Sequence, residues 1–260
     1  MIGIIGQGFV GTAVKTKFEK YFTVKTYDKF NTEGNSTLED TDGSCNTDII
    51  ESVLDQVDLI CDVNKEKKTL VLKSTVICGT TERLNQKYKN LNIVFNPEFL
   101  TERNAIEDYN NQQRIILGGE RPYTTELKQI FSKVFPNSHI IKTDSTHAEM
   151  VKYLTNTFLS VKVSFANEIY QLCQQLNIDY DKVVEYGTLD PRLGSSHWSV
   201  PGPDGDFGYG GHCFPKDLSA LLKLSSDLNT VNNVLNSTKV TNDEIRALRD
   251  WESMKGRAIV

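Results

Sequence analysis

The first 28 residues constrain the fold more than any other part of this 260-residue chain. A short apolar run, residues 2–6, leads directly into Gly6-Gln7-Gly8-Phe9-Val10-Gly11 and then into a helical spacing of apolar residues. A second strand-like run, residues 23–27, ends at Asp28. A strand, a glycine-rich turn, a helix and a second strand with an acidic end are typical of a dinucleotide-binding βαβ unit.

Each part of this unit has a physical role toward a dinucleotide. The glycines permit a tight turn and a close approach of the pyrophosphate, and the helix N-terminus attracts its negative charge. Asp28 would accept hydrogen bonds from the adenosine ribose, and its charge disfavours a 2′-phosphate, so the sequence favours NAD over NADP. The expected cofactor contacts in this unit are Gly6, Gly8, Phe9, Val10, Gly11, Asp28 and Lys29.

Apolar runs alternate with helical spacings from there to about residue 144. This alternation predicts an α/β domain, residues 1–144, with a mostly parallel, doubly wound, Rossmann-like sheet. Ligands of such sheets bind at the carboxyl ends of the strands, where Gly6, Asp28, Thr75 and Glu98 should gather. Residues 29–47 are interpreted as loop. Strands are expected at 59–61, 69–73, 92–95, 114–117 and 138–141, and helices at 49–57, 80–88 and 123–135.

From residue 145 onward the pattern becomes helical. Between Ser145 and Leu176 apolar residues recur at steps of three and four without Pro or Gly, which predicts one helix of about 45 Å. A helix this long needs partners, so we expect a homodimer to form through it. Lys152 and Asn156 are one turn apart and lie on the same face of this helix. That face either lines a site or is a solvated polar surface. Further helices are expected at 179–186, 216–228 and 231–254, which makes 145–260 an all-helical domain.

The stretch from Phe207 to Asp217 combines three glycines with Cys213. The glycines allow tight turns and leave room for a ligand against the main chain. Pro215 suits the first position of a helix, so Cys213 is expected just before a helix N-terminus, near Lys216. The helix dipole and the cation favour the thiolate, which is the nucleophilic form of cysteine. Cys213 is therefore the candidate nucleophile, and the alternative is a small residue in a glycine-rich turn.

Composition restricts the remaining classes of function. The net charge is −5, and no basic run offers a footprint for nucleic acid. No apolar run approaches the length of a membrane span, and residues 1–6 do not resemble a signal peptide. The five cysteines are odd in number and lack CxxC spacing. We therefore expect neither a disulfide framework nor a metal site, and a cytoplasmic location.

The chemistry-bearing segments resemble, in their order, those of the UDP-glucose/GDP-mannose dehydrogenase family. They are the glycine turn with Asp28, then 73–75, 96–102, 149–157, 167–168, 190–194 and 207–217. The resemblance implies an NAD-dependent, four-electron oxidation of a nucleotide sugar's primary alcohol to a carboxylate, through a thiohemiacetal and a thioester on Cys213. UDP-glucose is the expected sugar. The alternatives are GDP-mannose, a UDP-N-acetylhexosamine, or a non-catalytic, NAD-binding, dimeric remnant.

The resemblance also implies the role of each catalytic residue. Lys152 and Asp217 would act on the C6 hydroxyl or hold a water, and Glu102 would assist thioester hydrolysis. Thr75 and Asn156 would position the water and the developing oxyanion. The implied catalytic residues are Cys213, Asp217, Lys152, Glu102, Thr75 and Asn156.

Ligand contacts follow from the same resemblance. Thr75, His212 and Lys216 would also contact NAD, and Arg192 would reach the neighbouring subunit's site. Single residues have plainer readings: Asp217 as a favourable acid in a first helical turn, Glu102 as a surface carboxylate, and Arg192 as an ion-pair residue. The implied sugar contacts are Glu98, Phe99, Leu100, Glu102, Lys152, Asn156, Arg192, Phe207 and Gly210.

The chain departs from the family pattern at several places. Family members continue into a second nucleotide-binding domain, which would be absent or barely begun at residues 255–260. Residues 62–68 stand where the family has a proline-threonine turn and an extra helix. The segment after Asp28 and the one between Arg192 and Phe207 also differ in length. These differences imply weaker recognition of the nucleotide.

Overall fold

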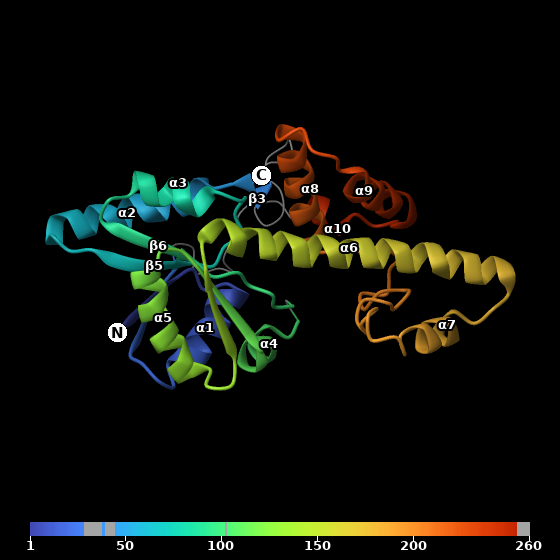
Figure 1. Ribbon diagram of the computed structural model, residues 1–260, viewed down its shortest axis with the longest axis horizontal. Coiled ribbons are helices and arrows are strands. Elements are labelled where there is room, and N and C mark those ends of the chain that lie inside the picture. Colours follow the sequence, from blue (N-terminus) through green and yellow to red (C-terminus); the bar gives the residue numbers. More distant parts are fainter. Residues whose placement is uncertain (29–37, 40–44, 102, 254–260) are drawn as a thin grey trace. The chain divides into compact units, whose positions relative to one another are not determined.

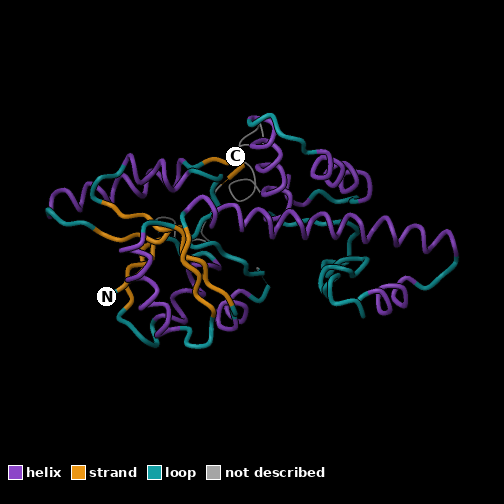
Figure 2. Tube along the Cα trace, viewed as in Figure 1, coloured by secondary structure: helices purple, strands orange, loops and turns teal. Residues whose placement is uncertain are grey.

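The computed structural model describes residues 1–28, 38–39, 45–101 and 103–253. They form two compact units. The first contains the described residues up to Leu38 together with Cys45–Lys152, and the second contains Glu39 and the described residues from Tyr153 onward. Figure 1 labels the helices and some of the strands, and Figure 2 shows that the described residues after Thr143 form only helices and loops.

The first unit alternates strands and helices, as the sequence predicts. Strand β1 (Ile2–Ile5) pairs in parallel with β2 (Val24–Tyr27), and a separate sheet has the order β5-β6-β7-β8. Its outer pairs are parallel, whereas β6 and β7 meet antiparallel. The four strands are β5 (Lys68–Leu72), β6 (Leu91–Phe95), β7 (Arg114–Gly118) and β8 (His139–Thr143), and a short third ladder joins β3 (Leu38–Glu39) to β4 (Cys45–Asn46). The helices are α1 (Phe9–Phe18), α2 (Asp48–Asn64), α3 (Thr80–Lys87), α4 (Ala105–Asn111) and α5 (Arg121–Val134).

Two hydrophobic cores lie on opposite faces of the larger sheet. Ile93 and Phe95 of β6 join one core with Leu84 of α3, while the intervening Val94 joins the other with Phe131 of α5. Side chains of a strand alternate between faces, so this division requires helices on both sides. Burying each of these large side chains contributes about 2 kcal/mol. The doubly wound α/β architecture is thereby confirmed.

The C-terminal part of helix α2 differs from the sequence-based prediction. Residues 59–61 were expected to form a strand, but α2 continues through them to Asn64. Leu54 and Cys61 are buried seven residues apart, a helical repeat, whereas Leu59 and Ile60 are exposed. The apolar content of the segment indicated a strand, although its periodicity is helical. Among the described residues β1 therefore pairs only with β2.

Helix α6 (Ser145–Leu176), whose bounds match the predicted helix, starts in the first unit and belongs to the second unit from Tyr153 onward. Asp144 caps its start, because its carboxylate accepts the backbone N–H of His147 at 2.9 Å. Further along, Ala166 and Cys173 of α6 form a core with Tyr180. The other helices are α7 (Tyr180–Gly187), α8 (Cys213–Asp227), α9 (Asn233–Ile245) and α10 (Asp250–Ser253).

Two helix boundaries and one additional helix also differ from the sequence-based expectations. The helix expected at 231–254 is interrupted, because Arg246 takes an extended backbone conformation between α9 and α10. Helix α8 begins at Cys213, so Pro215 occupies its third position, where its missing N–H still costs nothing. Helix α4 was not predicted, because its short sequence is mostly polar. The strand expected at 255–260 lies outside the described residues.

Glu51 of α2 provides a test of how α2 is held to α3. Its carboxylate binds Lys87 at 2.6 Å and Arg83 at 2.8 Å, and the hydrogen bond from Lys87 chiefly lowers the pKa of Glu51 from 4.5 to about 2. A lowered folded-state pKa stabilises the fold above pH 4.5, and this contribution is lost as the pH falls toward 2. We expect Glu51→Gln to reduce the free energy of unfolding by about 0.5 kcal/mol at neutral pH, since solvent screens such pairs.

Urea denaturation of both proteins at a series of pH values measures this difference. The difference between Glu51→Gln and the wild type should shrink below pH 4.5. Glu126→Gln, an exposed position on α5, serves as the control and should match the wild type throughout. A constant difference from neutral to acidic pH would show that the ion pairs do not stabilise the α2–α3 contact.

Candidate active site

The glycine turn after β1 is held closely against the start of α1. Gly6 has a φ of +88°, which favours glycine, and its N–H donates to the Tyr27 carbonyl at 2.9 Å. A Cβ on Gly11 would lie 2.0 Å from the Gly6 carbonyl oxygen, so only glycine fits there. Gly8 stands at the N-cap of α1, and Phe9 is its first residue. The turn therefore exposes the N-terminal N–H groups of a helix, as a pyrophosphate site requires.

Asp28 is brought to this turn, as predicted. It follows the last residue of β2, and its Oδ2 accepts the backbone N–H of Gln7 at 2.6 Å. Val10 lies in the first turn of α1, which contains no acidic residue to repel a phosphate. These residues fit the adenosine and pyrophosphate parts of NAD. Lys29, the remaining expected contact of this turn, lies outside the described residues.

A second polar group lies at the carboxyl ends of β5 and β6. Lys73 follows β5, and its Nζ lies 2.7 Å from Asn96 Oδ1 and 3.0 Å from Glu98 Oε2. Glu98 Oε1 accepts the backbone N–H of Phe99 at 2.7 Å. Lys152 of α6 donates to the Glu98 carbonyl oxygen. The predicted sugar contacts Glu98, Phe99 and Lys152 are thus neighbours, and Lys73 connects them to the sheet.

For three other candidate residues of the first unit, the structure gives less support for a role in the site. Thr75 lies three residues after the end of β5, and its carbonyl oxygen accepts the Cys45 thiol at 3.6 Å. The Leu100 side chain packs against the hydrophobic core, while its backbone N–H donates to Glu98 Oε1 at 3.2 Å. Glu102, the expected assistant in hydrolysis, lies outside the described residues.

The second unit places Cys213 at the first position of α8, partly buried. One turn further along, Asp217 is almost completely buried, and its Oδ2 accepts the amide of Asn156 at 2.6 Å. Lys216 donates to the other carboxylate oxygen at 2.6 Å. Asp217 and Asn156 are therefore brought together, and a buried cation balances the carboxylate. His212, the N-cap of α8, is also buried.

The segment before Cys213 places the remaining sugar candidates. Phe207 is partly exposed, and its ring lies 5.7 Å from that of Tyr170. Gly210 is closely packed, because a Cβ there would lie 2.1 Å from Nη2 of Arg246. Arg192 is largely exposed and bonds Asp190 through two 2.9 Å contacts of its Nε. In this chain Arg192 thus has the geometry of an ion-pair residue.

The sequence reasoning did not single out Lys73 or Arg246 as individual site residues. The sequence did contain a signal for Lys73, because this residue ends the predicted strand 69–73, just before Thr75 and at the sheet edge where Glu98 was expected. No such sequence signal marked Arg246, since it lies in a segment predicted as an uninterrupted helix. Its importance depends on partners more than thirty residues away in the chain, such as Asp204 and Phe207.

Some kinds of site are absent from the described part of the chain. No three His, Cys, Asp or Glu side chains gather there in a way that could hold a metal ion. None of its helices, α6 included, is long and apolar enough to cross a membrane. The five cysteines form no disulfide, so Cys213 is present as a thiol, as a nucleophile must be.

Gly11 offers a direct test of the dinucleotide site. Because a Cβ there would overlap the Gly6 carbonyl, Gly11→Ala must displace the turn from the start of α1. We expect the affinity for NADH to fall roughly tenfold or more, since the pyrophosphate depends on those N–H groups. Titration of NADH fluorescence measures the change. Gly3→Ala is the matched control, because a Cβ at Gly3 meets nothing within 4 Å, and NADH binding equal to wild type in Gly11→Ala would contradict the assignment.

Comparison with known proteins agrees with this geometry. The NAD binding domain model of the UDP-glucose/GDP-mannose dehydrogenase family matches residues 35–137, and the central domain model of that family matches 146–244. The putative UDP-glucose 6-dehydrogenase YtcA of Bacillus subtilis is 35% identical over 213 residues, covering 78% of this chain and 47% of that protein. The UDP-glucose 6-dehydrogenase of Rickettsia bellii is 30% identical over 275 aligned residues, covering 94% and 61%.

This chain thus spans about half the length of the curated relatives it matches. Among solved structures, a UDP-glucose dehydrogenase from the hyperthermophilic archaeon Pyrobaculum islandicum has a TM-score of 0.81 at 24% identity, covering 94% of this chain and 68% of that one. At this identity the likeness concerns the fold. Because two models of one family match most of its length, the chain belongs to the UDP-glucose/GDP-mannose dehydrogenase family, and its N-terminal part is an NAD-binding domain of that family.

Proposed function

We propose that this chain oxidises the primary alcohol of a nucleotide sugar to a carboxylate, with UDP-glucose as the substrate and NAD as the oxidant. The observation that carries the proposal is the position of Cys213 at the start of α8, one turn before the buried Asp217–Asn156 pair. A thiol at a helix N-terminus is favoured as the thiolate. The relatives named as UDP-glucose 6-dehydrogenases support the choice of sugar.

The first oxidation needs a group that takes the proton of the C6 hydroxyl. Lys152 and Asp217 perform this role in the proposal, directly or through a water that they hold. NAD, when bound, accepts a hydride in each of the two oxidations. The Gly6–Gly11 turn and Asp28 hold its adenosine and pyrophosphate parts, and Glu98 and Phe99 contact the sugar.

The second oxidation proceeds on Cys213. Its thiolate adds to the C6 aldehyde, and the resulting thiohemiacetal becomes a thioester when the C6 hydrogen leaves with its electron pair. Asn156 and Thr75 position the oxyanion and the water, and Lys152 adds positive charge. Water then attacks the thioester, assisted by Glu102, which releases the carboxylate and restores the thiol.

Replacing Cys213 tests this scheme. Cys213→Ser should reduce release of the uronate roughly a thousandfold, because a serine hydroxyl stays protonated near neutral pH and is a much weaker nucleophile than a thiolate. Uronate release is measured by chromatography, and NADH by its absorbance, with UDP-glucose, GDP-mannose and a UDP-N-acetylhexosamine as substrates. Two NADH formed per sugar consumed identify the substrate.

A matched control is available at Cys78. Burial raises the pKa of the Cys78 thiol to about 11, so it is not a nucleophile near neutral pH, and Cys78→Ser should retain activity. Undiminished uronate release by Cys213→Ser would rule out the thioester scheme.

A second candidate function is a non-catalytic, NAD-binding protein. It requires only the dinucleotide turn, with Gly6 at a positive φ and Asp28 bound to the Gln7 N–H. This function predicts NADH binding without NADH formation from any of the three sugars. The same assays therefore decide between the two functions.

We also propose that the chain forms a homodimer through α6. Apolar side chains that are more than half exposed follow one stripe of this helix, at spacings of four and seven: Leu154, Phe158, Phe165, Leu172 and Leu176. Contiguous exposed apolar surface of this kind marks an interface. The second copy is the partner because the stripe repeats along the length of one helix, so two antiparallel copies match one another.

Phe158→Glu is expected to dissociate this dimer, because it places a carboxylate in the middle of the stripe. Light scattering after gel filtration measures the mass. Gln174→Glu, an equally exposed position on α6, should leave the dimer intact. A monomeric wild-type protein, or a dimeric Phe158→Glu variant, would disprove the interface.

A further inference from the structure

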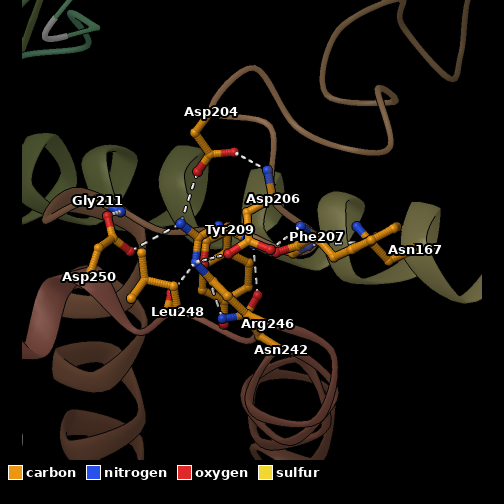
Figure 3. A network of polar contacts seen from close by, with 11 residues as sticks. Asn167, Asp204, Asp206, Phe207, Tyr209, Gly211, Asn242, Arg246, Leu248 and Asp250 are labelled. Atoms are coloured by element: carbon orange, nitrogen blue, oxygen red, sulfur yellow. Dashed lines mark hydrogen bonds and ion pairs between the residues drawn. The ribbon is translucent and has the colours of Figure 1, made fainter.

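Arg246 is a buried arginine between α9 and α10, with a side chain only 3% exposed. Figure 3 shows it at the centre of a polar network. Its Nε donates to the Leu248 carbonyl at 2.9 Å, and Nη1 donates to the Phe207 carbonyl at 3.3 Å. Its Nη2 donates to Asp204 Oδ2 at 2.9 Å and to Asp250 Oδ1 at 3.0 Å. The planar guanidinium is thus used in several directions at once, which a lysine cannot reproduce.

The charges of the network depend on one another. A guanidinium remains protonated in proteins, so a buried arginine needs acceptors and counter-charges. Asp204 and Asp250 provide them, and Asp206 Oδ2 lies 4.0 Å from Nε. Burial opposes ionisation of Asp204, but the hydrogen bonds from Arg246 and from the backbone of Asp206 prevail and lower its pKa. Asp204 therefore faces Arg246 as a carboxylate near neutral pH.

Both ends of the glycine segment before Cys213 are attached to Arg246. The Phe207 carbonyl accepts from the guanidinium directly. At the other end, the Gly211 N–H donates to Asp250 Oδ2 at 2.9 Å, while the second oxygen of Asp250 accepts from Arg246. Between them, Gly210 lies against the guanidinium so closely that a side chain is excluded. Cys213 follows only two residues after Gly211.

The middle of the segment is fixed by two amides. Asn242 accepts the Tyr209 N–H at 2.7 Å and donates to the Tyr209 carbonyl at 3.1 Å. Asn167 of α6 accepts the Gly208 N–H at 3.2 Å. These contacts, shown in Figure 3, attach the segment to α6 and α9. Arg246 is the charged member that joins its two ends.

We propose that Arg246 is a positioning residue for the catalytic thiol. It acts through Phe207, Gly210 and Asp250 to fix the chain that enters α8, and so sets where Cys213 stands relative to the N-terminal N–H groups of that helix. The proposal rests on the proposed function for its catalytic consequence. Its structural part, the placement of the Cys213 thiol, is independent of turnover.

Arg246→Lys tests the proposal with the charge retained. We expect kcat to fall roughly tenfold or more while the KM values for NAD and the sugar stay within about twofold, because a misplaced nucleophile affects the transition state and not substrate binding. A purely structural loss of folded protein would lower the amount of active enzyme without this split, and active-site titration corrects for that amount. Arg249→Lys is the matched control, since Arg249 is three residues away and partly exposed, and it should behave as wild type.

A second measurement needs no turnover. The rate at which iodoacetamide alkylates Cys213 is followed by peptide mass spectrometry, with an added peptide that contains one exposed cysteine as the internal standard. In Arg246→Lys the Cys213 rate relative to this standard should fall about threefold or more, because the thiolate loses support from the helix N-terminus. If the wild type forms no NADH with any sugar, the proposed function fails and this rate alone decides the role of Arg246.

Each remaining outcome is decisive. A folded Arg246→Lys variant with unchanged kcat and unchanged Cys213 alkylation overturns the proposal, and so does a loss confined to KM. If Arg246→Lys does not fold, Asp250→Asn replaces it, because this variant keeps one oxygen for the Gly211 N–H but loses the charge and the acceptor for Arg246. It should show the same changes at about threefold in kcat. Wild-type values of kcat and of the alkylation rate in Asp250→Asn would also overturn the proposal.

Discussion

Buried cations must find acceptors inside the protein, and the chemistry-bearing segments of this chain are arranged around that constraint. Lys152, Lys162, Lys216 and Arg246 are each less than one tenth exposed. An isolated buried ammonium would cost several kcal/mol, so each side chain fixes the backbone or carboxylate that it binds. Lys152 does this for the chain at Glu98. Precise placement of the site segments is therefore a consequence of charge burial.

Lys162 illustrates the same constraint away from the proposed chemistry. Its Nζ donates to the carbonyls of Leu193 at 2.9 Å and Gly194 at 3.1 Å, and it lies 4.7 Å from the ring centre of Trp198. Burial lowers the pKa of Lys162, because the ammonium loses contact with solvent. Trp198 also donates to the Gly194 carbonyl at 2.9 Å. The segment after Arg192, whose length and sequence depart from the family pattern, is thus attached to α6 by one lysine.

Periodic features of the fold could be predicted from the sequence, and features that depend on distant partners could not. The bounds of α6 were correct because its apolar spacing continues without a break for 32 residues. The strand predicted at 59–61 was wrong. Three consecutive apolar residues indicated a strand, but Cys61 lies seven residues after Leu54 and continues the buried stripe of a helix. Gly6, Gly11 and Asp28 were found because their roles depend on local backbone geometry.

The Arg246 network is a feature that depends on distant partners and could not be predicted from the sequence. Arginine in a polar helical segment ordinarily indicates a solvated face. Its burial depends on Asp204, which is 42 positions away, and on Phe207, which is 39 away. No local pattern encodes such contacts. The same holds for Asp217. The sequence predicted it in a helix close after Cys213, but its hydrogen bond to Asn156, 61 positions away, could not be predicted from spacing.

The glycines before Cys213 need a different explanation from the one the sequence suggested. They were expected to leave room for a ligand against the main chain. At Gly208 a Cβ would lie 2.3 Å from Asn242 Oδ1, and at Gly210 the corresponding space is filled by Arg246. Gly208 also has a φ of +68°, which favours glycine. Gly211 has a φ of +69°, and a Cβ there would meet nothing within 4 Å. Gly208 and Gly210 therefore allow close packing of the side chains that hold the segment, while Gly208 and Gly211 provide the turns with positive φ that lead into α8. A rigid approach to the thiol, rather than an open one, is what this sequence encodes.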